Sequence, residues 1–189
     1  MSAAADSPHR HRLTVADYYR MAEVGILAPD ARVELIDGEI IDMAPPGSLH
    51  AAAVHRLNEA CHRAVKGRAT VLVQNPIRLN EYSEPQPDLA LLRRREDFYS
   101  ERHPRPADVL LVIEIADTSL RFDRETKTPL YALHGVPELW LVDLRGMRLV
   151  RHRVPKEGAY TLVDEPHVGA ALEASALSGV AIDLRGLFG

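Results

Sequence analysis

Apolar runs typical of buried strands recur along the chain. The run at 109–115, VLLVIEI, is apolar at every position except Glu114, a pattern typical of a strand buried on both faces of a sheet. Two apolar runs at 33–43 flank Asp37-Gly38, which predicts a tight hairpin. Shorter runs predict further strands at 70–74, 77–80, 87–92, 138–143, 147–154 and 159–164.

Two other segments are predicted to form helices. Steps of three and four predict the main amphipathic helix over 49–65, with Ser48 as its cap. A capping-box pattern that begins at Thr14 predicts a shorter helix over 15–23.

A third helix is expected after the strand at 109–115. It should cover 121–135, and Pro129 inside it predicts a kink or a late start. Residues 93–108 have no clear period and predict a long surface connection. Strands and helices in this order indicate an α/β fold, in which helices flank a mixed central β-sheet.

The length of 189 residues fits one domain. No repeat, low-complexity tract or linker divides the chain. We therefore expect a flexible N-terminal tail at 1–12 and a single domain at 13–189.

The composition is that of an ordinary folded protein, with 46% hydrophobic and 26% charged residues. No apolar run is long enough for a membrane helix, and the N-terminus lacks the apolar core of a signal peptide. These features predict a cytoplasmic protein that does not enter a membrane. Cys61 is the only cysteine, which excludes an intrachain disulfide and a thiolate zinc cluster and leaves a small core residue as its simplest role.

The net charge of −4 argues against a surface coated with basic residues for nonspecific nucleic-acid binding. A local basic groove remains compatible with it.

Two acidic residues, Asp88 and Glu114, stand in or beside apolar strands. If these strands are neighbours, the carboxylates converge, and two buried anions then require a shared proton or a bound cation. Oxygen ligands of this kind suit Mg²⁺ or Mn²⁺, and magnesium normally takes only one or two carboxylates. The pair therefore predicts a phosphoryl-transfer site. The alternative is a structural ion pair, such as Glu114 with Lys127.

Lys127 follows Glu114 by 13 residues, on the helix expected to pack over the sheet. Lysines supply only three of the 23 basic residues, at positions 66, 127 and 156. A lysine ammonium can position a water and help to deprotonate it, which a guanidinium does poorly.

The blocks ELIDGEIIDMAPPGSLHAAAVHRL, QPDLALL and VIEIADTSLRFDRETKTPLYALHGVPELWLVD together resemble the Uma-type restriction endonucleases, a branch of the PD-(D/E)xK nuclease superfamily. The resemblance runs from about residue 13 almost to the C-terminus. It implies a restriction-endonuclease-like core and cleavage of DNA that depends on a divalent metal. It also implies that Asp88 and Glu114 are the two acids of the site, and that the carbonyl of Ile115 is a further metal ligand.

The chain departs from the superfamily pattern at Ala116, where that pattern has lysine. The resemblance implies that Lys127 takes this role from the following helix. It also implies that Glu34 is an additional acid of the metal site, against the alternative of an outward-facing strand residue. His50, at the start of a helix, is a candidate substrate contact, against the alternative of a helix-terminal polar residue.

Three functions are compatible with these residues. The first is an endonuclease that cleaves DNA. The second is a non-catalytic nucleic-acid or protein-binding module on a degenerate nuclease fold, which Ala116 and the acidic net charge favour. The third is a hydrolase of another phosphoester.

A homodimer is also expected, because cutting both strands of a duplex needs two sites. The apolar segment 138–143 is a candidate for its interface, or else part of the core.

Overall fold

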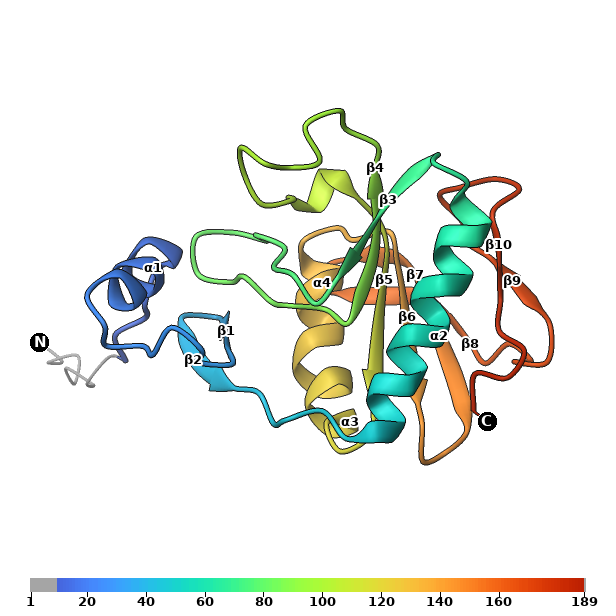
Figure 1. Cartoon of the computed structure of the whole chain (residues 1–189), viewed down its shortest axis with the longest axis horizontal. Coiled ribbons are helices and arrows are strands. Elements are labelled where there is room, and N and C mark those ends of the chain that lie inside the picture. The colour runs from blue at the N-terminus through green and yellow to red at the C-terminus, as the bar shows by residue number, and fades with distance from the viewer. Residues whose placement is uncertain (1–9, 189) are drawn as a thin grey trace, which may run out of the picture.

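A six-stranded mixed sheet forms the centre of the computed structural model, which describes residues 10–188 (Figure 1). Its order is β3-β4-β5-β6-β7-β8, and only the β5–β6 pair is parallel. The strands are β3 (Ala69–Val73), β4 (Leu89–Arg93), β5 (Val109–Ala116), β6 (Glu138–Asp143), β7 (Arg148–Lys156) and β8 (Ala159–Asp164). The predicted α/β class with a mixed central sheet is confirmed.

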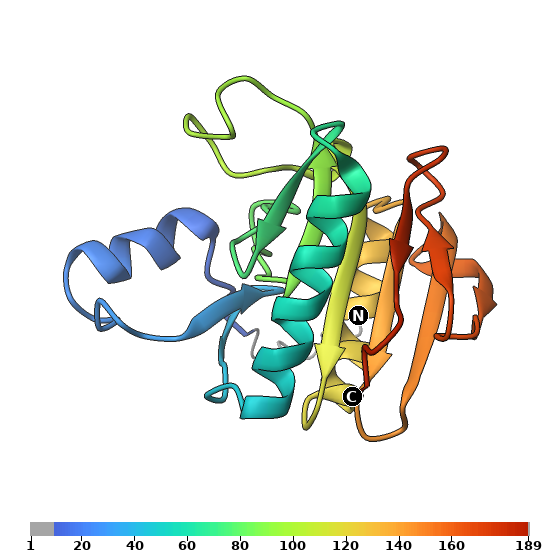
Figure 2. The ribbon, with the colours of Figure 1, turned by 45° about the vertical axis from the view of Figure 1, so that its right-hand side comes forward.

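Helices cover the two faces of this sheet. The long helix α2 (Ser48–Val65) lies on one face, and the helical segment after β5 lies on the other (Figures 1 and 2). Successive residues of β5 face opposite layers, so that Ile113 belongs to the core under α2 and Val112 to the core on the other side. Glu114 therefore faces the same side as Val112.

The segment that crosses from β5 to β6 is an interrupted helix. It contains α3 (Leu120–Phe122), a π-helical turn (Asp123–Lys127) and α4 (Thr128–Leu133). Pro129 lies in the first turn of α4, where a missing N–H costs little. The kink or late start predicted from Pro129 takes the form of this π-helical turn.

The N-terminal part of the chain stands beside the sheet (Figure 1). It contains α1 (Val15–Glu23), capped by Thr14 and Asp17 as predicted, and the hairpin of β1 (Val33–Ile36) and β2 (Glu39–Asp42). A β-bridge between Leu35 and Glu84 joins the hairpin to the loop before β4.

The C-terminal part adds a small sheet that the sequence pattern did not predict. Strands β9 (Ala171–Glu173) and β10 (Ala181–Asp183) pair antiparallel, and Ile182 packs in the core around α2. Both strands have three residues, which is too short to show an alternating pattern.

Two expected elements differ from the structure. Residues 77–80 form no strand, because their amides donate to loop carbonyls, as Ile77 does to Pro85 at 2.9 Å. Ser48 is not the cap of α2 but its first residue, and Gly47 occupies the cap position without a side-chain hydrogen bond.

The segment 138–143 is an interior strand, so it cannot supply the dimer interface considered for it. Every residue of β6 is buried between β5 and β7. Trp140 is fully buried there, and its indole N–H donates to Glu138 Oε1 at 2.7 Å.

Cys61 is also fully buried, as expected of a core residue. Within residues 10–188, none of the helices has the length and apolar character needed to cross a membrane. Most of the predicted N-terminal tail, residues 1–9, lies outside the described residues.

Candidate active site

The pairing of β4 with β5 brings Asp88 opposite Glu114. Leu89 pairs with Ile113 across these antiparallel strands, so the next position outward sets Asp88 against Glu114. Asp88 lies just before β4, and Glu114 lies near the end of β5. The convergence expected from two acids on neighbouring strands is therefore present.

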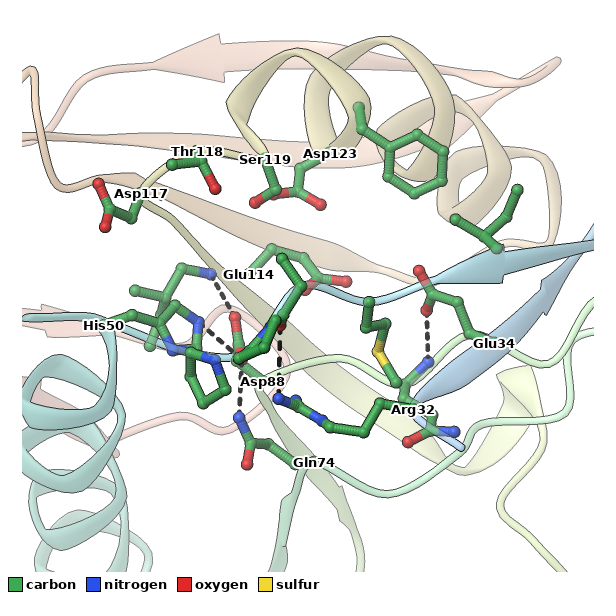
Figure 3. A pocket seen from close by; sticks show the side chains of 18 of the residues that line it. Arg32, Glu34, His50, Gln74, Asp88, Glu114, Asp117, Thr118, Ser119 and Asp123 are labelled. Atoms are coloured by element: carbon green, nitrogen blue, oxygen red, sulfur yellow. Dashed lines mark hydrogen bonds and ion pairs between the residues drawn. The ribbon is translucent and has the colours of Figure 1, made fainter. Parts of the chain in front are cut away.

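Asp88 is held by neighbours on three sides. Its Oδ2 accepts a hydrogen bond from the backbone N–H of Ile115 at 2.9 Å. Its Oδ1 lies 3.0 Å from His50 Nε2 and 3.2 Å from the side-chain Nε2 of Gln74 (Figure 3). The hydrogen bond to Asp88 raises the pKa of His50 and favours its charged form.

Lys127 lies between two buried carboxylates. Its Nζ is 2.8 Å from Glu114 Oε1 and 3.3 Å from Glu34 Oε2, and side-chain exposures in this group are only 4–5%. Glu34 is also fixed by the N–H of Gln86, which donates to Oε2 at 2.9 Å. The ion pair considered as a structural alternative for Glu114 is thus present, with Glu34 as a second partner.

Tyr131 completes this cluster from the same helical segment as Lys127. Positions four apart lie on one face of a helix, and the Tyr131 hydroxyl donates to Glu114 Oε1 at 2.8 Å. Two donors therefore engage Oε1, whereas Oε2 accepts no hydrogen bond from the described residues.

Burial and neighbouring charges shift the pKa values of Glu114 and Lys127. Burial raises the pKa of Glu114 to about 8, because one ammonium only partly offsets desolvation and the neighbouring acids. The pKa of Lys127 is also raised, since the attraction of Glu114 and Glu34 outweighs the desolvation that opposes it. Lys127 is therefore a permanent cation, and Glu114 is an acid that a further cation would ionise.

One pocket of about 780 Å³ opens at the ends of β4 and β5 (Figure 3). Every predicted site residue lines it, from the hairpin, α2, both strands and the π-helical turn. They are Glu34, His50, Asp88, Glu114, Ile115 and Lys127.

The oxygens of the pocket fit a magnesium ion with few protein ligands. Glu114 Oε2 has no donor among the described residues, and Asp88 lies opposite it. The C=O of Ala116 accepts from the N–H of Leu144 on the β6 side, whereas the N–H of Ile115 donates to Asp88 on the β4 side. The N–H and C=O of one strand residue point to the same edge of the strand, and those of the next residue point to the opposite edge. The carbonyl of Ile115 therefore faces Asp88, as expected of the predicted metal ligand.

No group of three or more His, Cys, Asp or Glu side chains within residues 10–188 is arranged to hold a metal. Two carboxylates and a carbonyl are nevertheless enough for Mg²⁺, which keeps several waters and binds substrate phosphate. Glu34 contacts Lys127 in this structure, and its role as a metal ligand stays a prediction.

His50 is more than a polar residue at a helix end. It lies in the first turn of α2, its Nε2 contacts Asp88, and its Nδ1 is buried without a partner in the described residues. Ser119 occupies the cap position of α3, where its hydroxyl donates to the carboxylate of Asp123 and makes no capping hydrogen bond.

Several residues of the pocket and of the buried cluster were not identified from the sequence. Gln86 had a signal, since it directly precedes the Pro-Asp pair, and so did Tyr131, four residues after Lys127. Gln74 and Arg32 lie at strand ends without a pattern that marks them.

The chain matches known proteins over nearly its whole length. The family model Uma2, described as "Putative restriction endonuclease", matches residues 15–185. A crystal structure from Anabaena variabilis ATCC 29413, described as a putative nuclease belonging to DUF820, has a similar fold, with a TM-score of 0.69 and 18% sequence identity over 93% of this chain and 97% of that chain. None of the curated proteins matches the chain.

Proposed function

Because the chain belongs to the Uma2 family of restriction-endonuclease-like proteins, we propose that it is an endonuclease that hydrolyses DNA phosphodiester bonds with Mg²⁺ or Mn²⁺. The observation that carries this proposal is the pairing of Asp88 with Glu114 at the end of the sheet, beside the buried Lys127. Buried acids with a fixed cation in a pocket are typical of sites for phosphoryl chemistry.

Asp88, Glu114 and the carbonyl of Ile115 would hold the metal. When bound, the ion would polarise the scissile phosphate and lower the pKa of a water. The raised pKa of Glu114 supports this assignment, since a divalent cation offsets the repulsion that keeps its proton bound.

Lys127 contributes a fixed positive charge. Two of its three N–H donors point to Glu114 and Glu34, which leaves the third for a water or a phosphate oxygen. Since its pKa is raised, Lys127 orients the water or stabilises the negative charge of the phosphate, and it does not accept the proton of the water. This changes the role expected from the sequence, in which lysine helped to deprotonate the water.

His50 is the candidate substrate contact on the α2 side of the pocket. Its charged form, favoured by Asp88, can donate to a phosphate oxygen. Glu34 assists by fixing Lys127.

A homodimer would supply the two sites that cutting both strands requires. Sedimentation velocity at several protein concentrations tests this expectation, and a monomer throughout would contradict it.

The decisive experiment is incubation of the protein with supercoiled plasmid and Mg²⁺ or Mn²⁺. Nicked and linear products are expected with metal and not with chelator. Asp88→Asn keeps the side chain's size but removes a ligand charge, so it should abolish cleavage while the circular dichroism spectrum stays unchanged. Cleavage that survives in this variant would refute the assignment.

The second candidate is a non-catalytic binding module, and the burial of Lys127 against the carboxyl groups of Glu34 and Glu114 favours it. DNA binding without cleavage, under every metal tested, would support this candidate over the nuclease. Cleavage of RNA or of a nucleotide ester alone would instead indicate a different phosphoester substrate.

A further inference from the structure

The pocket contains far more negative than positive charge. Its acidic lining residues are Glu34, Asp42, Asp88, Glu114, Asp117 and Asp123. Lys127 and Arg32 are the only lysine or arginine residues that line it within the part of the chain that the structure describes. A polyanionic substrate therefore enters a site that opposes it, unless a cation is available to meet it.

Lys127 cannot serve as that cation for long-range attraction. Its Nζ lies within 3.3 Å of the carboxyl groups of Glu34 and Glu114, and only 5% of its side chain is exposed. Its charge is buried and paired before substrate arrives.

Arg32 is in the opposite situation. It has no carboxylate partner within residues 10–188, and its one side-chain hydrogen bond is a long one, 3.4 Å, to the carbonyl of Ala44. The residue is exposed at the start of the hairpin strand β1, yet its side chain extends into the pocket toward Asp88 (Figure 3).

The backbone around Arg32 is fixed. Its carbonyl accepts from the N–H of Met43 at 2.8 Å, which extends the pairing of β1 with β2 by one position. A guanidinium on a fixed strand end, with unused donors and an open pocket before it, matches the geometry that binds phosphate through two parallel hydrogen bonds.

We infer that Arg32 binds a backbone phosphate of the DNA strand that enters the pocket. This inference rests on the proposed function and specifies which residue of the chain holds the substrate. The contact supplies affinity for any nucleic-acid sequence, because phosphates carry no base identity.

The test compares Arg32→Gln with Arg94→Gln, which removes the same charge from an exposed arginine beyond the other end of β4. The affinity for a fluorescein-labelled duplex is measured by anisotropy at several KCl concentrations with Ca²⁺, and a gel confirms that the duplex stays intact. Loss of one phosphate contact lowers the magnitude of the negative slope of log affinity against log salt by about 1. We expect this change for Arg32→Gln, with affinity reduced about tenfold, and no change for Arg94→Gln.

Arg32→Lys separates charge from geometry. It should restore the salt slope, because the charge returns, but only part of the affinity, since an ammonium cannot make two parallel bonds. If the protein cleaves DNA, Arg32→Gln should raise KM more than it lowers kcat. An Arg32→Gln slope equal to that of the parent protein would overturn the inference.

A small phosphate-containing ligand tests the role of Arg32 independently of whether the protein cleaves DNA. Thymidine 3′,5′-bisphosphate is titrated while the Nε–H signal of Arg32 is followed by NMR. A shift of that signal, with binding weakened in Arg32→Gln, supports the phosphate site even in a protein that cleaves no DNA. An unmoved signal, or equal binding by both proteins, contradicts it. Failed plasmid cleavage with a positive titration would reject the nuclease alone.

Discussion

Lys127 is the residue on which the buried charges of the pocket depend. Replacing one partner of a buried ion pair leaves the others uncompensated, at a cost of about 3–5 kcal/mol. Lys127→Met should therefore lower the free energy of unfolding of the metal-free protein by about this amount in urea titrations.

Lys156 offers a matched control for this change. It is an exposed lysine on β7, so Lys156→Met should change stability by no more than about 0.5 kcal/mol. Equal effects of the two substitutions would show that Glu34 and Glu114 do not need a cation.

Glu114 should make the stability of the metal-free protein depend on pH. Its pKa rises from an ordinary 4.5 to about 8 on folding, so between these values the folded state keeps a proton that the unfolded state has lost. Stability then falls as pH rises through this window, by up to roughly 1.4 kcal/mol per pH unit.

Glu114→Gln removes that proton and should flatten the dependence. Urea titrations of both proteins in chelator, from pH 4.5 to about 8, make the comparison. Parallel curves would contradict a raised pKa at Glu114.

Some site residues could be predicted from the sequence and others could not. Asp88 and Glu114 were identifiable because an acid beside or within an apolar strand needs a partner. Lys127 depended mainly on the family resemblance, since 13 residues separate it from Glu114 and only the fold brings them together. Arg32 and Gln74 stand at strand ends, where sequence periodicity carries no information about which side chain reaches a pocket.

Among the elements, the β1–β2 hairpin carries both Arg32 and Glu34 to the pocket, and Gly38 in its turn is sterically constrained. Gly38 has a φ of +82°, and a Cβ there would lie 2.6 Å from Arg12 Cβ and 2.9 Å from Arg12 Cα. Gly25 has a similar φ of +77° but nothing within 4 Å of such a Cβ. Comparing Gly38 with Gly25 separates the effect of the contact with Arg12 from the effect of the left-handed backbone conformation.

Gly25→Ala should cost about 1 kcal/mol for its left-handed conformation. Gly38→Ala should lower the free energy of unfolding by about 1–3 kcal/mol more, because the segment before α1 must move. Thermal unfolding of both variants measures the difference, and activity should fall only in Gly38→Ala. Equal losses of stability would show that the contact with Arg12 is easily relieved.

The helices and strands with long or clear apolar patterns were predicted correctly, and the very short strands were not. The hairpin, α1, α2 and the strands β4 to β8 all have strong apolar patterns or turn signals, and all are present. Residues 77–80 have a strand-like composition, but their amides donate to carbonyls of the loops before and after β4. The strands β9 and β10 owe their formation to the core around α2, a tertiary effect that no local pattern shows.

For the molecule as a whole, charge sets the conditions for binding DNA. The net charge is −4 and the pocket is lined mainly by acids. A divalent cation should therefore raise affinity for a duplex by about tenfold or more, since it offsets repulsion between the site and the phosphates. Anisotropy in Ca²⁺ and in chelator measures this effect. Asp88→Asn should lose most of it, and equal affinity of the parent protein in both conditions would refute a metal at this site.

Trp140 is the only tryptophan of the chain, and it is sealed in the middle of the sheet, away from the pocket lining. Its intrinsic fluorescence is therefore a label-free optical reporter for the central strands. The emission should shift to longer wavelength when water reaches the indole on unfolding. A substitution in the pocket that spares this signal has altered the chemistry of the site, and one that shifts it has disrupted the sheet.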